Sequence, residues 1–234
     1  MKRIISVLIA SGLLSACTVV PEANRAGTGA RSTAPASSGA VATRLPAPVA
    51  AHPQDRQCLA QLTDTGAQFV PVADAYLGEG CSTVGTVQLS ALRSDATRLS
   101  LSNMGPVQCG VGAAFAAWAR YGVDRAAQQI LGSRLQRIET MGSYACRNVA
   151  GSSRRSAHAT AGAIDIAAFV LEDGRRISVL QHWHGGSAAE KEFLRTVQRS
   201  ACRRFATVLG PEYNAAHRDH FHVEGVMTDS SFCR

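Results

Sequence analysis

The sequence predicts an α+β domain in which a small, mostly antiparallel sheet is flanked by helices and stabilised by disulfides. Three observations predict this class. Residues 188–209 repeat apolar side chains at helical spacing, and short apolar runs at 135–138 and 164–170 are typical of strands. The chain also contains seven cysteines, and six of them follow Cys17, which is an even number and allows three disulfides.

Two segments are predicted to be helices. Residues 107–119 are small and apolar on nearly every side, which is typical of a buried helix. Residues 188–209 have one apolar stripe, and charged side chains line the rest of the surface. The stripe consists of Phe193, Val197, Ala201, Phe205 and Val208. Gly210 and Pro211 predict where this helix ends.

The predicted strands lie mostly in the second half of the chain. The apolar runs at 135–138 and 164–170 are the clearest of them. The letters EDG at 172–174 predict a turn, after which residues 176–180 resume a strand pattern. Residues 220–226 are expected to form a last short strand, so the sheet should be mostly antiparallel.

The first residues predict export. Lys2 and Arg3 precede an apolar run at 4–14 that is too short to span a bilayer. The letters LSAC at 14–17 resemble the lipobox of bacterial lipoproteins, which implies a signal peptide at 1–16 and lipidation of Cys17. Two or more acyl chains give stable anchoring. An ordinary cleaved signal is the alternative.

The expected location is the bacterial cell envelope, as a periplasm-facing lipoprotein that a lipid anchor holds on the membrane. Thr18 stands where an aspartate would retain the protein at the inner membrane, so the outer membrane is favoured. Residues 17–54 are rich in Ala, Pro, Ser, Thr and Gly and have no hydrophobic period, which predicts a disordered tether. Residues 55–234 are long enough for one domain with a sizeable core.

Six cysteines remain in this domain, and an oxidising compartment predicts that they form three disulfides. Six cysteines allow fifteen connectivities. A tetrathiolate zinc site is the alternative, but no two cysteines have the C-x-x-C spacing. The pairs we expect are Cys58–Cys81, Cys109–Cys146 and Cys202–Cys233.

The chain is basic. Removing Lys2 and Arg3 with the signal peptide lowers the formal net charge from +7 to +5, which still suits an anionic partner. Export argues against nucleic acid, and no nucleic-acid motif is visible. Peptidoglycan carboxylates and anionic envelope polymers are the partners we expect. A solvated basic surface without a specific partner is the alternative.

The grouping of the histidines indicates a metal site. His158 lies seven residues before Asp165, and His220 and His222 follow more than fifty residues later. A catalytic zinc ion takes three protein ligands of nitrogen and oxygen type and leaves one position open. Asp165 lies in an apolar run, where a charge must be paired or must coordinate a metal. The alternatives are hydrogen-bonded core histidines and pairing of Asp165 with Arg147 or Arg155.

Four segments carry a resemblance to a known family. They read GSYACRN at 142–148, SAHATAGAID at 156–165, DGRRISV at 173–179 and FATVLGPEYN at 205–214. Together they resemble the bacterial extensin-like C-terminal domain family. The pattern Ser-x-His-x6-Asp followed by Asp-x-His-x-His is similar to the metal site of the hedgehog/D-Ala-D-Ala peptidase superfamily. This second resemblance implies a hedgehog/DD-peptidase-like fold.

The resemblance also implies roles for individual residues. His158, Asp165 and His222 would bind Zn²⁺. Asp219 would be the general base, and His220 would contact a ligand or stabilise the oxyanion. Arg147 and Ser156 would bind substrate. Because Cys146 interrupts the family's spacing before the arginine, Arg154 or Arg155 could hold the substrate carboxylate instead.

Three other histidines could border the cleft. They are His217 and the pair His182 and His184, and we expect them on the surface or in the pocket wall rather than among the ligands.

The resulting expectation is an envelope-anchored, zinc-dependent peptidase, a carboxypeptidase or endopeptidase, that acts on peptidoglycan peptides. Two alternatives stay open at this point. One is a zinc-containing lipoprotein that binds the cell wall without turnover, and the other is a disulfide-stabilised structural protein whose histidines are incidental.

Overall fold

The computed structural model describes residues 53–234. The predicted signal peptide, the predicted lipidation of Cys17 and the tether as far as residue 52 lie outside the described residues. Helix α1 begins at Pro53, one residue before the expected end of the tether at residue 54. No helix in the described part of the chain combines the length and the hydrophobicity that a membrane span requires.

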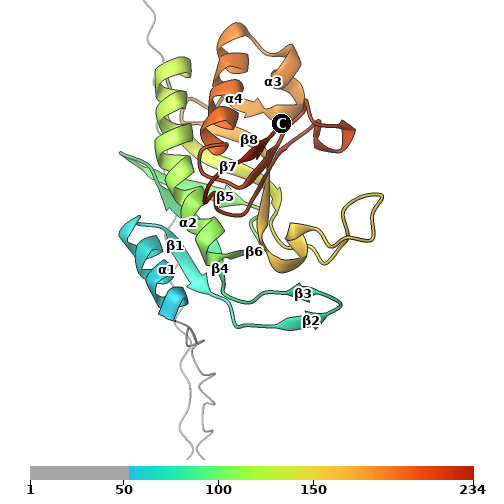
Figure 1. Cartoon of the computed structure of the whole chain (residues 1–234). Coiled ribbons are helices and arrows are strands. Elements are labelled where there is room, and N and C mark those ends of the chain that lie inside the picture. Colours follow the sequence, from blue (N-terminus) through green and yellow to red (C-terminus); the bar gives the residue numbers. More distant parts are fainter. Residues whose placement is uncertain (1–52) are drawn as a thin grey trace, which may run out of the picture. The chain divides into compact units, whose positions relative to one another are not determined.

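The main sheet has ten strands and is mostly antiparallel, with helices against it (Figure 1). Its order is β1-β4-β5-β7-β8-β11-β10-β12, and β6 and β9 pair with β4 and β8. Only the pairs β5–β7 and β10–β12 are parallel. The expected α+β class is confirmed, although the sheet is larger than predicted.

The strands of this sheet are β1 (Gln68–Pro71), β4 (Thr86–Arg93), β5 (Arg98–Ser102), β6 (Pro106–Gln108), β7 (Leu135–Gly142), β8 (Ala163–Leu171), β9 (Arg176–Ser178), β10 (Thr207–Leu209), β11 (Phe221–Glu224) and β12 (Phe232–Cys233). A separate hairpin consists of β2 (Tyr76–Gly78) and β3 (Cys81–Ser82). The helices are α1 (Pro53–Asp64), α2 (Cys109–Trp118), α3 (Val179–Gly185) and α4 (Ala188–Ala201). Shorter helical segments are η1 (Ala119–Asp124), η2 (Ala127–Leu131), η3 (Ala157–Thr160) and η4 (Ala215–His217).

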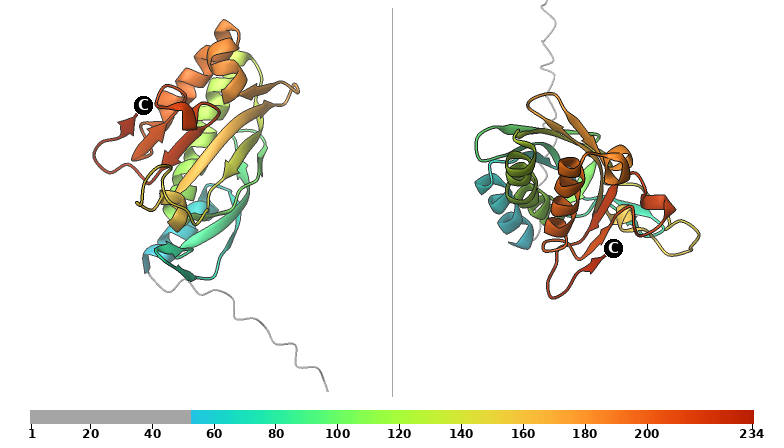
Figure 2. Two further views of the ribbon diagram at one scale, coloured as in Figure 1. Left: turned by 90° about the vertical axis from the view of Figure 1, so that its right-hand side faces the viewer. Right: turned by 90° about the horizontal axis from the view of Figure 1, so that it is seen from above.

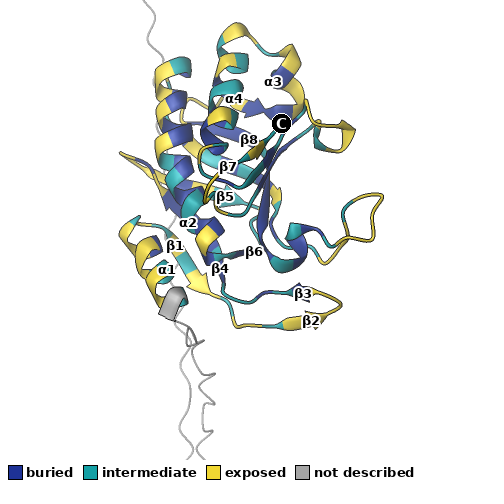
Figure 3. Ribbon diagram, viewed as in Figure 1, coloured by how far each residue is buried: buried dark blue, intermediate teal, exposed yellow. Residues whose placement is uncertain are grey.

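The core lies between the sheet and the helices α2 and α4, and α4 packs beside η1 and η2, which continue α2 (Figure 2). The indole of Trp118 packs edge-on against Phe169 of β8 and against Phe205, and its Nε1 donates a hydrogen bond to the Val197 carbonyl of α4. Burial of each such side chain contributes roughly 1.5–3 kcal/mol. Figure 3 shows the buried faces of both helices directed at the sheet.

Three predicted element boundaries are wrong. The helix expected at 107–119 starts at Cys109 and continues through η1 and η2. The helix expected at 188–209 ends at Ala201, because residues 207–209 pair with both β11 and β12. The strand expected at 176–180 stops at Ser178, whose side chain accepts a hydrogen bond from the Gln181 amide and so caps α3.

Three disulfides are present, as expected, but only one predicted pairing is confirmed. Cys202 pairs with Cys233. The pairs Cys58–Cys81 and Cys109–Cys146 are wrong, because the bonds join Cys58 to Cys109 and Cys81 to Cys146. Helix α1 packs against α2 and brings Cys58 to the first residue of α2, while the β2–β3 hairpin holds Cys81 against the segment before η3.

Candidate metal centre

Two neighbouring strands bring Asp165 and His222 together. In the antiparallel pair of β8 and β11, Asp165 and His222 are direct partners, so their side chains project from the same face of the sheet. The immediate neighbours of Asp165 and His222 in sequence point to the opposite face of the sheet. There, Ile164, Phe221 and Val223 are buried in the core. The site therefore occupies the polar face of two strands whose opposite face anchors the fold.

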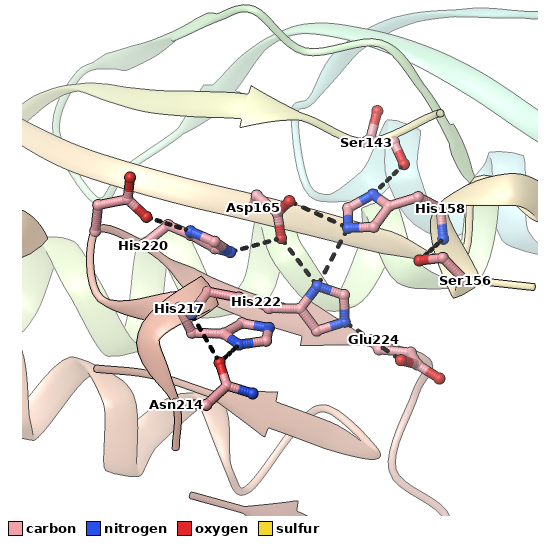
Figure 4. Close-up of polar contacts among 11 residues, drawn as sticks. Ser143, Ser156, His158, Asp165, Asn214, His217, His220, His222 and Glu224 are labelled. Carbon is pink, nitrogen blue, oxygen red and sulfur yellow. Dashed lines mark hydrogen bonds and ion pairs between the residues drawn. The ribbon is translucent and has the colours of Figure 1, made fainter. Parts of the chain in front are cut away.

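His158 reaches the same point from η3, a single turn of 3₁₀ helix. The Ser156 hydroxyl accepts a hydrogen bond from the His158 amide and starts this turn, and Ala161 ends it in the left-handed region at φ 56°. The His158 Nε2 atom lies 3.2 Å from Asp165 Oδ2 and 3.2 Å from His222 Nδ1, and His222 Nδ1 lies 2.9 Å from Asp165 Oδ1 (Figure 4). All three side chains are buried.

This convergence fits a zinc ion. One donor atom from each of His158, Asp165 and His222 lies within 4.8 Å of the other two. Two imidazole nitrogens and one carboxylate oxygen are the donor set that catalytic zinc sites use. The three residues predicted as ligands are thus brought together, and Asp165 contacts histidines rather than Arg147 or Arg155.

The second nitrogen of each imidazole has an acceptor. His158 Nδ1 donates to the Ser143 carbonyl at 2.8 Å, and His222 Nε2 donates to the Glu224 carboxylate at 3.3 Å. In the neutral form of each imidazole, these acceptors place the proton on His158 Nδ1 and on His222 Nε2. The lone pairs of His158 Nε2 and His222 Nδ1 then point toward the same position. Such contacts fix the tautomer and the ring orientation that a metal ligand needs.

The charges of the metal-free site are strongly coupled. Burial raises the pKa of the Asp165 carboxyl, but the hydrogen bonds from His158 and His222 outweigh burial and hold that pKa well below its usual range. Burial lowers the pKa of His222, but the hydrogen bonds to Asp165 and Glu224 outweigh it and raise the pKa to about 9. The site therefore attracts a positive charge, either a proton or a metal ion.

Asp219 and His220 form a pair beside the three ligands. Asp219 lies in the turn that enters β11, as its expected role required, and its Oδ1 atom lies 2.8 Å from His220 Nδ1. The other nitrogen, His220 Nε2, lies 3.5 Å from Asp165 Oδ1. His220 lines the cavity that adjoins the three donor atoms, whereas Asp219 is not among its lining residues.

A cavity of about 330 Å³ opens onto the three donor atoms. One wall is a turn in which Asn148 pairs with Arg155 and the Val149 amide donates to the Arg154 carbonyl. Because side chains alternate along paired strands, one set faces the cavity and the other faces away. The set that faces the cavity is Arg147, Val149, Arg154 and Ser156.

The comparisons with known proteins identify the family. The family described as Extensin-like protein C-terminus matches residues 56–234. The chain belongs to this extensin-like family. No curated protein and no solved structure matches the chain.

Within the extensin-like domain, the two cavity-facing arginines have no carboxylate within ion-pair distance among residues 53–234. Arg155, the third predicted binder of a substrate carboxylate, faces away from the cavity. Its guanidinium binds the Glu79 carboxylate at 3.0 Å and the Asn148 side-chain oxygen at 2.9 Å. Arg147 and Arg154 therefore remain the predicted binders.

The other histidines of the extensin-like domain separate into two groups. His217 lies in the cavity wall, with ring centroids 5.2 Å from His220 and 5.8 Å from His222. Burial, followed by the charges of His220 and His222, lowers the pKa of His217 to about 4, so it is neutral at physiological pH. His182 instead closes the first turn of α3 and accepts from the Ser178 amide. Neither His182 nor His184 lines the cavity.

Sequence reasoning missed three residues of the extensin-like site. Ser143 offers its backbone carbonyl, which no side-chain pattern reveals. Tyr213 borders the cavity from the loop after β10. Glu224 could have been found, because it lies two residues after His222 and strand periodicity places both side chains on one face.

Proposed function

We propose that this extensin-like protein is an envelope-anchored, zinc-dependent peptidase that cleaves peptide bonds in peptidoglycan. One observation carries the proposal: the donor atoms of His158, Asp165 and His222 converge at the floor of an open cavity. A structural zinc site is closed by four protein ligands, whereas a catalytic site keeps one position for water or substrate. The similarity of the motif to the hedgehog/D-Ala-D-Ala peptidase superfamily supports the same reaction.

The chemistry divides between the metal and the side chains around it. A bound zinc ion supplies a Lewis acid that polarises an amide carbonyl and makes water available as a nucleophile near neutral pH. The Asp219 carboxylate accepts a hydrogen bond from His220 Nδ1, so the lone pair of the neutral imidazole lies on Nε2, beside Asp165, where it can take a proton from the attacking water. The imidazolium formed in this way can pass its proton to the leaving amine. Asp219 thus orients the base and stabilises its charged form.

The side chains of the cavity wall favour a peptide substrate that carries a carboxylate. Arg147 and Arg154 face the cavity, and no carboxylate in the described part of the chain lies within ion-pair distance of either. The hydrogen bond with His222 lowers the pKa of Glu224 most, and the charge of Arg154 helps to lower it. Guanidinium groups bind carboxylates through paired hydrogen bonds. Peptidoglycan peptides carry such carboxylates. The Ser156 hydroxyl lines the same wall but already caps η3, so it would contact a substrate only as a hydrogen-bond donor.

Location in the envelope is part of the proposal. Lipidation of Cys17 and the tether at 17–54 would hold the domain within reach of the peptidoglycan layer. Cys17→Ser should therefore move the protein from the membrane fraction to the soluble periplasmic fraction, as measured by immunoblotting of fractionated cells. Recovery of the variant with the membrane at the wild-type level contradicts the anchor.

A muropeptide digest tests the activity. We expect the full-length, zinc-loaded protein to convert defined muropeptides to products whose masses differ by hydrolysis of one peptide bond. His158→Ala should contain no stoichiometric zinc and should leave the muropeptides intact. Wild-type protein that holds zinc and binds muropeptides without cutting them would establish the non-catalytic cell-wall-binding alternative. Wild-type protein without stoichiometric zinc would overturn the metal centre itself.

A further inference from the structure

Glu224 occupies the last position of β11, on the same face as His220 and His222. Its carboxylate is part of the cavity wall, and its side chain is 38% exposed. Among the described residues, the only cationic or ionisable group within ion-pair distance of this carboxylate is the His222 imidazole. The carboxylate is therefore directed at one nitrogen of one predicted ligand.

The geometry separates Glu224 from the ligands themselves. Glu224 Oε2 lies 3.3 Å from His222 Nε2, whereas the nitrogen that faces Asp165 and His158 is His222 Nδ1. The carboxylate consequently lies on the far side of the imidazole ring from the point where the donors converge. It can act on a bound ion only through His222.

His158 and His222 differ in the kind of acceptor that the second ring nitrogen contacts. A histidine that binds a metal through Nδ1 must carry its proton on Nε2, and an acceptor at Nε2 selects that tautomer and makes the ring a stronger donor. The Ser143 carbonyl performs this task for His158 from the backbone. For His222 the acceptor is a side chain, and a side chain can be replaced without altering the strand.

We propose that Glu224 is a positioning residue that holds His222 in the metal-binding tautomer and orientation. The proposal rests on the zinc site of the proposed function, but it concerns affinity for the ion rather than turnover. It is independent of which bond is cut, so loss of the muropeptide activity would leave it standing.

The test is the zinc dissociation constant of the full-length protein, measured by competition with a chromophoric chelator. We expect Glu224→Ala to weaken zinc binding about 10-fold to 100-fold, which is the usual effect of removing such a partner. Glu224→Gln should weaken it less, because the amide oxygen still accepts the Nε2 proton. Glu192→Ala is the matched control, because it removes an exposed carboxylate on α4 and should leave the constant unchanged.

Three outcomes would overturn the proposal. A dissociation constant for Glu224→Ala within twofold of wild type shows that the contact does not position His222. An equal loss in Glu192→Ala shows that net charge, not the hydrogen bond, controls affinity. Wild-type protein that binds no zinc removes both this proposal and the metal centre, whereas the first two outcomes leave the metal centre intact.

Cobalt(II) spectra of Glu224→Gln, which preserves the shape of the side chain, report the ligand geometry directly and should shift from the wild-type spectrum.

Discussion

At the scale of single residues, His222 is the predicted ligand at which a proton and a metal ion would compete. In the metal-free protein its pKa is raised from 6.5 to about 9 by Asp165 and Glu224 against the effect of burial. A raised folded-state pKa stabilises the fold fully below the unfolded value, and this contribution is lost as the pH rises through the folded value. We therefore expect the free energy of unfolding of the metal-free protein to fall between about pH 6.5 and pH 9.

Urea unfolding in the presence of a chelator measures this effect. The variant His222→Gln cannot bind the proton, so its free energy of unfolding should vary less across the same pH window. Equal pH slopes for wild type and variant would show that another group controls the stability. The zinc affinity should change in the opposite direction and increase with pH, because zinc must displace the proton.

The Arg154→Ala variant tests whether the substrate binds through a carboxylate. Removing a charge-assisted hydrogen bond from a guanidinium costs about 1.5–3 kcal/mol, which corresponds to roughly a 10-fold to 100-fold change. We expect Arg154→Ala to raise KM for a carboxylate-bearing muropeptide by this factor, with a smaller effect on kcat. Arg199→Ala, at an exposed position of α4, controls for the loss of one positive charge. A KM unchanged by Arg154→Ala, or raised equally by both variants, contradicts the role.

The spacing of the histidines around Asp165 indicated a metal site, but it was the resemblance to a known metal-site motif that selected His158, Asp165 and His222 as its ligands. Their partners were not found in the same way. The acceptor for His158 is a backbone carbonyl at Ser143, and its direction depends on the path of the chain after β7. Asp219 was expected to face the cavity, but the turn before β11 directs it at His220.

At the scale of elements, the segment between β7 and η3 sets the shape of the cavity. It is held by the Cys81–Cys146 disulfide and by the ion pair of Arg155 with Glu79, both to the β2–β3 hairpin. We expect the double variant Cys81→Ser/Cys146→Ser to lose about 2–4 kcal/mol of stability. It should also bind zinc more weakly, because the same segment carries the Ser143 carbonyl that orients His158.

The disulfide Cys202–Cys233 provides the control for that variant. It joins the end of α4 to β12, away from the segment that forms the wall, so Cys202→Ser/Cys233→Ser should lose stability without a change in zinc affinity. Chelator competition and urea unfolding on both double variants separate the two effects. Equal zinc affinities in the two variants would show that the hairpin does not organise the metal centre.

Hydrophobic periodicity predicted the elements whose buried residues recur at helix or strand spacing. It predicted the other elements poorly. It found β7, β8, β11 and the first part of α4. It extended α4 too far because Phe205 and Val208 are as buried as the helical stripe, although they lie beyond Ala201. The strands between residues 68 and 102 were missed, since they include short edge elements with exposed side chains such as Val70.

At the scale of the whole molecule, the family model matches residues 56–234, and the domain boundary expected at residue 55 stays a prediction. The disulfide connectivity could not be obtained from the sequence, because it depends on how α1 packs on α2 and where the β2–β3 hairpin lies. The candidate metal centre likewise joins residues that are far apart in sequence. His158, Asp165 and His222 come from η3, β8 and β11, so their geometry requires the folded sheet.

This dependence on the folded sheet predicts that zinc stabilises the whole domain. An ion that binds only the native state stabilises it by about 4 kcal/mol when its free concentration is a thousand times the dissociation constant. For a domain of this size that corresponds to a rise of about 10 °C in Tm. We expect zinc to raise the Tm of the chelator-treated wild-type protein by this amount, as measured by calorimetry.

Two variants serve as controls for this prediction. His158→Ala should show no such rise, whereas His184→Ala, which replaces an exposed histidine outside the cavity, should retain it. A rise of the same size in His158→Ala would show that the stabilising ion binds elsewhere.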